Sequence, residues 1–394
     1  MDALLTGLDR LLAGAGELDG RRFGVLAHGA SLTADLEPIH LALARAGQTP
    51  SVLFAPEHGF YGVEQDMVPL GDQRDPWTGV TIRSLYGDHE ASLRPAPEAF
   101  SDLELLLIDL QDIGCRYYTF AATAVWSAAV ALEEGVEVWV LDRPNPLGGM
   151  AVEGNLRQPG FDSFVGAFAL PVRHGLTLAE LVLLEAERQG WAERPRIFAL
   201  DGWRRGAIWP PLGRPWIAPS PNMPTFDTAL VYPGSCLIEA TELSEGRGTT
   251  RPFEWIGAPG LDARALAERL NDAALPGVRF VPTYFKPQYQ KHAGRTCGGI
   301  EIVVTDGAAF RSFRTGVELL AALAELEPGV FAWRRDPYEF VSDRPAIDLL
   351  SGDSRLRRSL EGDEDLSDWI DSWSADESAF RDERRSILLY PEEP

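Results

Sequence analysis

The first 200 residues alternate short apolar runs with helical patterns, and this alternation constrains the fold more than any other feature. The apolar runs that we predict to be strands are residues 22–27, 52–55, 81–85, 103–110 and 137–141. The helical patterns cover residues 36–46, 118–134 and 177–189. Such alternation is typical of a parallel sheet with helices on both faces. We therefore predict an α/β fold whose N-terminal domain has a Rossmann-like parallel sheet.

The second half of the chain predicts a smaller α+β domain. Residues 201–225 are rich in Pro, Gly and Trp, lack periodicity and predict a long connection. After it come predicted helices at 261–274 and 315–326 and predicted strands at 279–284 and 299–305. A chain of 394 residues also exceeds one ordinary core. We predict a catalytic domain at 1–228 and a smaller domain at 229–394 that closes an active-site cleft.

The charge balance, the lack of long apolar runs and the N-terminal sequence limit the classes of partner and the expected compartment. With 36 basic and 59 acidic residues the net charge is −23, which disfavours nucleic acid and anionic membrane surfaces as partners. No run of about 18 apolar residues occurs, so no membrane span is expected. The N-terminus lacks the basic and apolar regions of a signal peptide, which predicts the cytoplasm. The sequence does not constrain the oligomeric state.

Common cofactor motifs are missing from the sequence. Residues 27–32 (Ala-His-Gly-Ala-Ser-Leu) follow the first predicted strand in place of G-x-G-x-x-G, and no Walker motif occurs. The three cysteines are too sparse and too widely spaced for a disulfide framework or a zinc motif. We therefore predict no cofactor and no metal.

Polar clusters follow the predicted strands or lie in loops rich in Gly and Pro. Their main polar members are Glu57 and His58; Asp109, Asp112 and Arg116; Asp142, Arg143, Asn145 and Glu153; Arg173 and His174; and Glu239, Glu242, Glu245 and Arg247. Three clusters follow consecutive strands of one parallel sheet, so they should converge on one edge. Any single cluster can also be structural, since Asp and Asn cap helices and Asp142 can pair with Arg143.

Three other reaction types would each need particular residues. A serine hydrolase would need the elbow G-x-S-x-G, which is absent. A nucleophilic Cys115 with His58 or His174 as base stays open, although cysteine is usually buried. A metal site built from His58, His174, Asp109 and Asp112 also stays open, without a recognisable ligand spacing.

Carboxylate chemistry fits the clusters better. Glycoside hydrolysis needs two carboxyl groups flanking one bond, one neutral and one ionised. The candidates are Glu57, Asp112, Glu153, Glu242 and Glu245. Aromatic residues that could cover sugar faces are Tyr61, Trp77, Tyr117, Tyr118, Trp209, Trp216 and Trp255. Arg116, Arg173 and Arg247 could bind a substrate carboxylate through two hydrogen bonds.

A series of motif blocks, in order along the chain, carries a family resemblance. They are Pro-Glu-His-Gly-Phe at 56–60, Asp-Leu-Gln-Asp-Ile-Gly at 109–114, Leu-Asp-Arg-Pro-Asn-Pro-Leu-Gly-Gly at 141–149, Val-Glu-Gly at 152–154, Pro-Val-Arg-His-Gly at 171–175, Pro-Ser-Pro-Asn-Met-Pro-Thr at 219–225, Tyr-Pro-Gly at 232–234 and Leu-Ser-Glu-Gly-Arg-Gly-Thr at 243–249. In these blocks the chain resembles the bacterial exo-β-N-acetylmuramidase (NamZ-like) family, long described as a domain of unknown function.

The resemblance implies a Rossmann-like domain, a smaller C-terminal domain and an active site in the cleft between them. It implies release of N-acetylmuramic acid from the non-reducing end of peptidoglycan fragments, so a muramic-acid-containing saccharide is the expected partner. Muramic acid carries a lactyl carboxylate that N-acetylglucosamine lacks, which would give the arginines a role.

Our hypothesis from the sequence is a metal-independent glycosidase. Glu57 is the expected catalytic carboxylate, with His58 orienting it, and the second carboxylate is Glu245, or else Glu153 or Asp112. The residues expected to bind the substrate are Arg116, Asp142, Arg143, Asn145, Arg173, His174, Asn222 and Arg247. The rivals are a non-catalytic binding protein for acidic sugars and a metal-dependent hydrolase using His58, His174 and Asp112.

Overall fold

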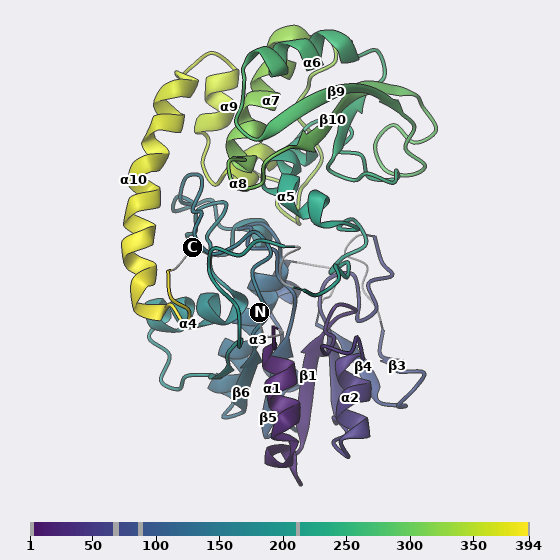
Figure 1. The fold of residues 1–394 in the computed structure, drawn as a ribbon, viewed down its shortest axis with the longest axis vertical. Coiled ribbons are helices and arrows are strands. Elements are labelled where there is room, and N and C mark those ends of the chain that lie inside the picture. The colour runs from purple at the N-terminus through teal and green to yellow at the C-terminus, as the bar shows by residue number, and fades with distance from the viewer. Residues whose placement is uncertain (1–3, 66–70, 86–89, 210–212, 393–394) are drawn as a thin grey trace.

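A seven-stranded sheet forms the centre of the N-terminal part (Figure 1). The computed structural model describes residues 4–65, 71–85, 90–209 and 213–392. The strands are β1 (Phe23–Ala27), β2 (Val52–Ala55), β3 (Gln73–Arg74), β4 (Thr81–Ser84), β5 (Leu105–Asp109), β6 (Glu137–Leu141) and β7 (Arg196–Phe198). Their order is β3-β4-β2-β1-β5-β6-β7, and only the β3–β4 pair is antiparallel. The predicted α/β class and the five predicted strands are confirmed.

Helices cover both faces of this sheet, as the alternation predicts. They are α1 (Gly7–Ala13), α2 (Ile39–Arg45), α3 (Phe120–Glu133) and α4 (Leu178–Gln189). Alternate strand residues pack with α1 and α2 in one apolar cluster and with α3 and α4 in another. Helix α4 begins with a capping box, in which Thr177 and Glu180 each accept a hydrogen bond from the other's backbone N–H.

A smaller α+β part follows the long connection. The strands β8 (Trp255–Ala258), β9 (Val278–Phe285) and β10 (Cys297–Val304) form an antiparallel sheet in the order β8-β10-β9. Its helices are α5 (Phe226–Ser235), α6 (Ala263–Asp272), α7 (Ser312–Leu326), α8 (Ala346–Ser351) and α9 (Arg355–Leu360). The predicted helices and strands of this half are confirmed, whereas β8, α5, α8 and α9 were not predicted.

Helix α5 escaped prediction because it contains Pro233 and Gly234, which normally interrupt helices. The glycine allows close packing, since a Cβ atom at Gly234 would lie 2.0 Å from the carbonyl oxygen of Ser312. A Cβ atom at Gly316 of α7 would likewise lie 2.2 Å from the carbonyl oxygen of Gly234. Close packing of α5 against α7 therefore requires glycine, although a local sequence pattern treats glycine as a residue that interrupts helices.

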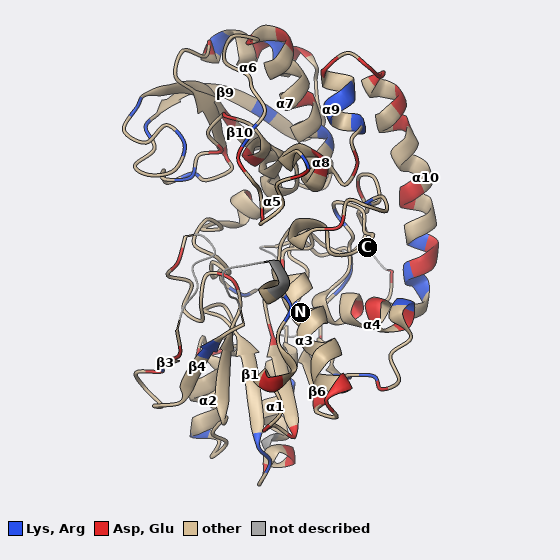
Figure 2. Cartoon of the chain, turned by 180° about the vertical axis from the view of Figure 1, so that it is seen from behind, with Lys and Arg blue, Asp and Glu red and all other residues tan. Residues whose placement is uncertain are grey.

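The acidic C-terminal segment forms α10 (Leu366–Arg384), which runs along one side of the molecule past both parts of the chain (Figure 1). Figure 2 shows acidic and basic residues along this helix, whereas Trp369, Trp373 and Phe380 are buried. Arg384 Nη1 donates to the carbonyl oxygen of His174 at 2.9 Å. The end of the chain therefore packs on the first domain, and the division of the chain at residue 228 stays a prediction.

No helix in the described ranges has the length and the apolar composition that crossing a bilayer requires.

Candidate active site

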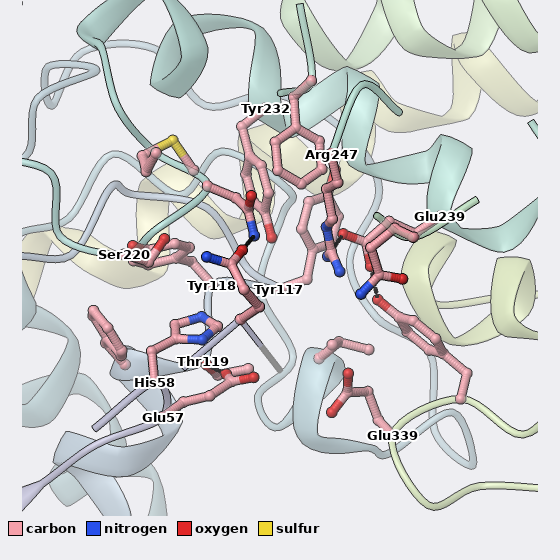
Figure 3. A pocket seen from close by; sticks show the side chains of 18 of the residues that line it. Glu57, His58, Tyr117, Tyr118, Thr119, Ser220, Tyr232, Glu239, Arg247 and Glu339 are labelled. Carbon is pink, nitrogen blue, oxygen red and sulfur yellow. Dashed lines mark hydrogen bonds and ion pairs between the residues drawn. The ribbon is translucent and has the colours of Figure 1, made fainter. Parts of the chain in front are cut away.

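A cavity of about 410 Å³ is lined by both halves of the chain (Figure 3). The first half contributes Glu57, His58, Gln65, Tyr117, Tyr118, Thr119, Phe120, Val165, Ser220, Asn222 and Met223. The second half contributes Tyr232, Glu239, Arg247, Phe253, Gln290, Arg334, Tyr338, Glu339 and Phe340. The cavity thus lies at the carboxyl ends of the parallel strands, where open α/β sheets usually bind ligands.

Glu57 reaches this cavity from the turn that follows β2. The hydroxyl group of Thr119 donates a hydrogen bond to Glu57 Oε2. Thr119 is the N-cap residue of α3, and the partial positive charge at a helix N-terminus favours a nearby anion. The sheet edge and α3 together place a carboxylate at the cavity wall.

The backbone of the turn after Glu57 is strained. His58 has φ = 69°, a left-handed conformation that is uncommon for any residue other than glycine. The turn is closed by a hydrogen bond from the N–H of Gly59 to the carbonyl oxygen of Pro56 at 3.1 Å. Such strain costs about 1–3 kcal/mol and is concentrated at functional sites, which supports a functional role for this turn.

Arg247 is the centre of a charged cluster on the opposite wall. Its guanidinium group forms an ion pair with Glu239, and its Nε lies 3.6 Å from Glu245 Oε1. Lys291 Nζ lies 3.0 Å from Glu245 Oε2. Burial raises the pKa of Glu245, but Lys291 and Arg247 outweigh it and leave that pKa below its usual value. Glu245 is therefore a permanently charged support for Arg247 and does not itself line the cavity.

The aromatic lining differs in part from the sequence interpretation. Tyr117 and Tyr118 line the cavity as expected, whereas the remaining predicted aromatic residues, Tyr61, Trp77, Trp209, Trp216 and Trp255, do not. The other aromatic residues at the cavity are Phe120, Tyr232, Phe253, Tyr338 and Phe340. Rings from both halves of the chain thus surround the polar groups.

Arg116, expected to bind substrate, is buried away from the cavity and binds backbone carbonyls instead. Its Nη1 donates to Asn155 O and Leu170 O, both at 2.8 Å. Its Nη2 donates to Leu350 O at 2.9 Å and Ser351 O at 2.8 Å, at the C-terminal end of α8. Arg116 therefore joins the two parts of the chain.

Glu153 and Arg173 also lie outside the cavity and contact each other. Arg173 Nη1 is 3.5 Å from Glu153 Oε2, and the backbone N–H of Arg314 donates to Glu153 Oε1 at 2.9 Å. Burial raises the pKa of Glu153. This pair connects the first domain to the start of α7.

Asp112 and His174 form a second buried pair outside the cavity. His174 Nε2 lies 4.0 Å from Asp112 Oδ2, and the N–H of Gly114 donates to the same oxygen at 2.6 Å. Burial raises the pKa of Asp112 to about 7, and burial together with Arg384 lowers that of His174 to about 3. The imidazole of His174 is therefore uncharged at neutral pH, whereas the carboxyl group of Asp112 is close to the midpoint of its titration.

The loop after β6 is held by its own polar residues. Tyr390 donates to Asp142 Oδ2 at 2.5 Å, and Arg143 binds Asp109 with contacts of 2.5 and 2.9 Å. Asn145 Nδ2 donates to Leu176 O at 2.9 Å. These side chains gather at the predicted sheet edge, but they form hydrogen bonds and ion pairs with neighbouring residues and do not line the cavity.

Of the residues predicted to be catalytic or to bind the substrate through polar groups, the structure brings four to the cavity: Glu57, His58, Asn222 and Arg247. The sequence interpretation gave no role to Arg334 and Glu339, and it noted Glu239 only as part of a cluster. The signal for Glu339 was weak, since Asp-Pro-Tyr-Glu-Phe at 336–340 shows neither helical nor strand periodicity.

The described residues also bear on the metal and cysteine alternatives. Within these ranges, no three His, Cys, Asp or Glu side chains are grouped as a metal site would require. Cys115 is buried and does not line the cavity, and burial raises the pKa of its thiol.

Comparison with known proteins decides the family. The models of exo-β-N-acetylmuramidase NamZ match residues 23–227 for its N-terminal part and 230–390 for its C-terminal part. The chain belongs to the NamZ family. It is 35% identical over 387 residues to the peptidoglycan β-N-acetylmuramidase NamZ of Bacillus subtilis (strain 168), covering 98% of this chain and 91% of that protein. The family resemblance predicted from the motif blocks is confirmed.

Two solved structures share the family fold. A DUF1343 family protein of Bacteroides fragilis NCTC 9343 superimposes with a TM-score of 0.87 at 29% identity, over 99% of this chain and 100% of that one. A second DUF1343 family protein of the same organism gives a TM-score of 0.73 at 24% identity, over 100% of both chains. The second similarity concerns the fold alone.

Proposed function

We propose that this protein is an exo-β-N-acetylmuramidase, a glycoside hydrolase that releases N-acetylmuramic acid from the non-reducing end of peptidoglycan-derived fragments. The observation that carries the proposal is Glu57, held by Thr119 in a cavity lined by carboxyl, arginine and aromatic side chains. The B. subtilis relative is a peptidoglycan β-N-acetylmuramidase, and this chain matches it over 91% of its length.

In this proposal Glu57 is a catalytic carboxylate and His58 positions it. Glycosidases of both stereochemical types need a second carboxyl group near the scissile bond. Glu245, Glu153 and Asp112 do not line the cavity, so we do not propose them for this role.

The dimensions of the cavity support action at a chain end. Its volume of about 410 Å³ lies near the lower end of the range for small-molecule sites, roughly 300–1,000 Å³. It suits one terminal sugar better than a long glycan. Aromatic rings can cover the apolar sugar face, and Asn222 offers an amide for a hydroxyl or acetamido group.

Arg247 is the residue that we expect to bind the lactyl carboxylate. Its pairing with Glu239 and Glu245 fixes the orientation of its guanidinium group, and arginine binds carboxylates through two parallel hydrogen bonds. Arg116, Arg173 and Arg143 are committed to other partners outside the cavity, so Arg247 is the one member of the predicted set in position.

The variant Arg247→Lys tests this assignment. Lysine keeps the charge between Glu239 and Glu245 but loses the planar two-donor geometry. We expect KM for muramic acid glycosides to rise about tenfold or more, because a hydrogen bond to a charged group contributes about 1.5–3 kcal/mol. Steady-state kinetics with Arg251→Lys as control checks this, since Arg251 is close in sequence but does not line the cavity. An unchanged KM would exclude Arg247 from carboxylate binding.

The experiment that separates the proposed function from its rivals is incubation with the disaccharide of N-acetylmuramic acid and N-acetylglucosamine. Detection of newly released reducing sugar, with and without a chelator, is the readout. The glycosidase releases sugar in both samples, a metal-dependent hydrolase only without chelator, and a binding protein in neither.

We also propose that the enzyme acts in cell-wall turnover and recycling, with the cytoplasm as the expected compartment. The supporting observation is the cavity volume of about 410 Å³, which suits a small peptidoglycan-derived fragment.

A further inference from the structure

We propose that Glu339 is the carboxylic acid that protonates the departing glycosidic oxygen, acting opposite Glu57. This inference rests on the proposed glycosidase function and adds the missing second carboxyl group. Neither the motif blocks nor the order of the parallel strands points to this residue.

Glu57 and Glu339 come from opposite walls of the cavity. Glu57 comes from the turn after β2, and Glu339 comes from a loop of the C-terminal half. In Figure 3 their carboxyl groups point toward one another across the cavity. A glycosidic bond between them would have one carboxyl group on either side, which is the arrangement that glycoside hydrolysis needs.

The loop that carries Glu339 is held rigidly in an unusual conformation. Tyr338 and Val341 exchange backbone hydrogen bonds of 3.0 and 2.9 Å, so Glu339 and Phe340 are the two central residues of a tight turn. Their φ angles are 49° and 67°, values for which such turns normally use Asn and Gly. The Tyr338 hydroxyl group donates to Glu239 Oε2 at 2.7 Å and anchors the turn. A glutamate kept at so strained a position suggests a functional reason.

The surroundings of Glu339 favour its neutral form. Burial, then Glu57 and then Glu239 raise its pKa to about 8, against the opposing effect of Arg247 and Arg334. Glu239 is itself bound by Arg247 and Tyr338. Glu339 Oε2 is buried and has no hydrogen-bond partner within the described part of the chain. The carboxyl group of Glu339 is therefore mostly protonated at neutral pH, and its Oε2 atom is available to the substrate.

The chemistry balances with these groups and one water molecule. The Glu339 proton passes to the glycosidic oxygen as the bond between that oxygen and the anomeric carbon breaks. The water oxygen ends on the anomeric carbon, and its proton returns the carboxyl pair to its starting state. One glycoside and one water give free N-acetylmuramic acid and the alcohol of the aglycone, whether Glu57 acts as base or as nucleophile.

The variant Glu339→Gln tests the role through the leaving group. A sugar hydroxyl leaves poorly without a proton, whereas dinitrophenolate leaves without one. We expect kcat/KM to fall about 10²–10⁴-fold on the natural disaccharide, the range that general acid catalysis contributes. The loss on the dinitrophenyl glycoside of N-acetylmuramic acid should be no more than about tenfold. The control Asp336→Asn, on the same loop but exposed and outside the cavity, should retain both activities.

The pH profile supplies a second readout that a structural role would not change. Glu339 is active when protonated, so kcat/KM of the wild type on the disaccharide should fall as the pH rises through about 8. The dinitrophenyl glycoside should not show this basic limb. Equal losses on both substrates in Glu339→Gln, or full activity of that variant, would overturn the assignment. A wild-type protein inactive on both substrates would instead refute the proposed function.

Discussion

Replacing Glu57 by Gln should lower kcat/KM on muramic acid glycosides by about 10²–10⁴-fold, the contribution of a positioned acid or base. Glutamine keeps the volume of the side chain and an oxygen that can accept the Thr119 hydrogen bond. It removes the negative charge and the basic oxygen. Loss of activity on both disaccharide and dinitrophenyl glycoside should distinguish this variant from Glu339→Gln, because Glu57 acts on the sugar and not on the leaving group.

The matched control is Glu64→Gln. Glu64 lies on the same loop, and its backbone N–H donates to the carbonyl oxygen of His58 at 3.3 Å, yet its side chain does not line the cavity. Steady-state kinetics and circular dichroism of both variants provide the comparison. Wild-type turnover by a folded Glu57→Gln protein would remove Glu57 from catalysis.

Replacing Arg116 by Met should lower the free energy of unfolding by about 3–4 kcal/mol, a large effect for one substitution. Methionine retains an apolar stem but cannot donate hydrogen bonds to the carbonyl groups of Asn155, Leu170, Leu350 and Ser351. A buried carbonyl group that loses a donor costs roughly 1–3 kcal/mol, and the cost is smaller where a second donor remains, as the N–H of Arg157 does for Leu170 O and Asn155 Nδ2 does for Ser351 O. Urea unfolding measures the change.

The exposed residue Arg264 supplies the control for this experiment. Its guanidinium group pairs with Glu268 on the surface of α6, and Arg264→Met should change stability by no more than about 0.5 kcal/mol. Below its unfolding transition, Arg116→Met should keep the wild-type KM. Unchanged stability with a raised KM would return Arg116 to the substrate-binding role that the sequence suggested.

The sequence predicts the first domain well because its signals are local. Apolar runs such as residues 103–110 predict buried central strands, and β5 is buried throughout. Since the carboxyl ends of parallel strands share one edge, the position of Glu57 after β2 also follows from the pattern. Its exposure to the cavity agrees with that expectation.

The sequence cannot separate charged residues that face the cavity from those that hold the cavity walls. Arg116, Glu153 and Asp142 have the composition of a binding site, but each is buried against backbone or side-chain partners far away in sequence. Their partners lie on α8, α7 and the C-terminal segment, which local periodicity cannot bring together.

Glu339 was missed because the sequence around it does not resemble a binding site or a turn. Its turn has Glu and Phe where a hairpin pattern expects Asn and Gly, so no turn signal precedes it. The hydrogen bond from Tyr338 to Glu239 holds the turn at the cavity. Contacts between residues far apart in the sequence therefore determine which residues of the C-terminal half line the cavity.

The most direct test of the central claim compares two disaccharides with wild-type enzyme. One carries N-acetylmuramic acid at its non-reducing end, linked to N-acetylglucosamine, and the other has the reverse order. Chromatography of the products over time is the measurement. The account predicts equal amounts of the two free sugars from the first disaccharide and no cleavage of the second. Intact first disaccharide after prolonged incubation, or equal cleavage of both, would contradict it.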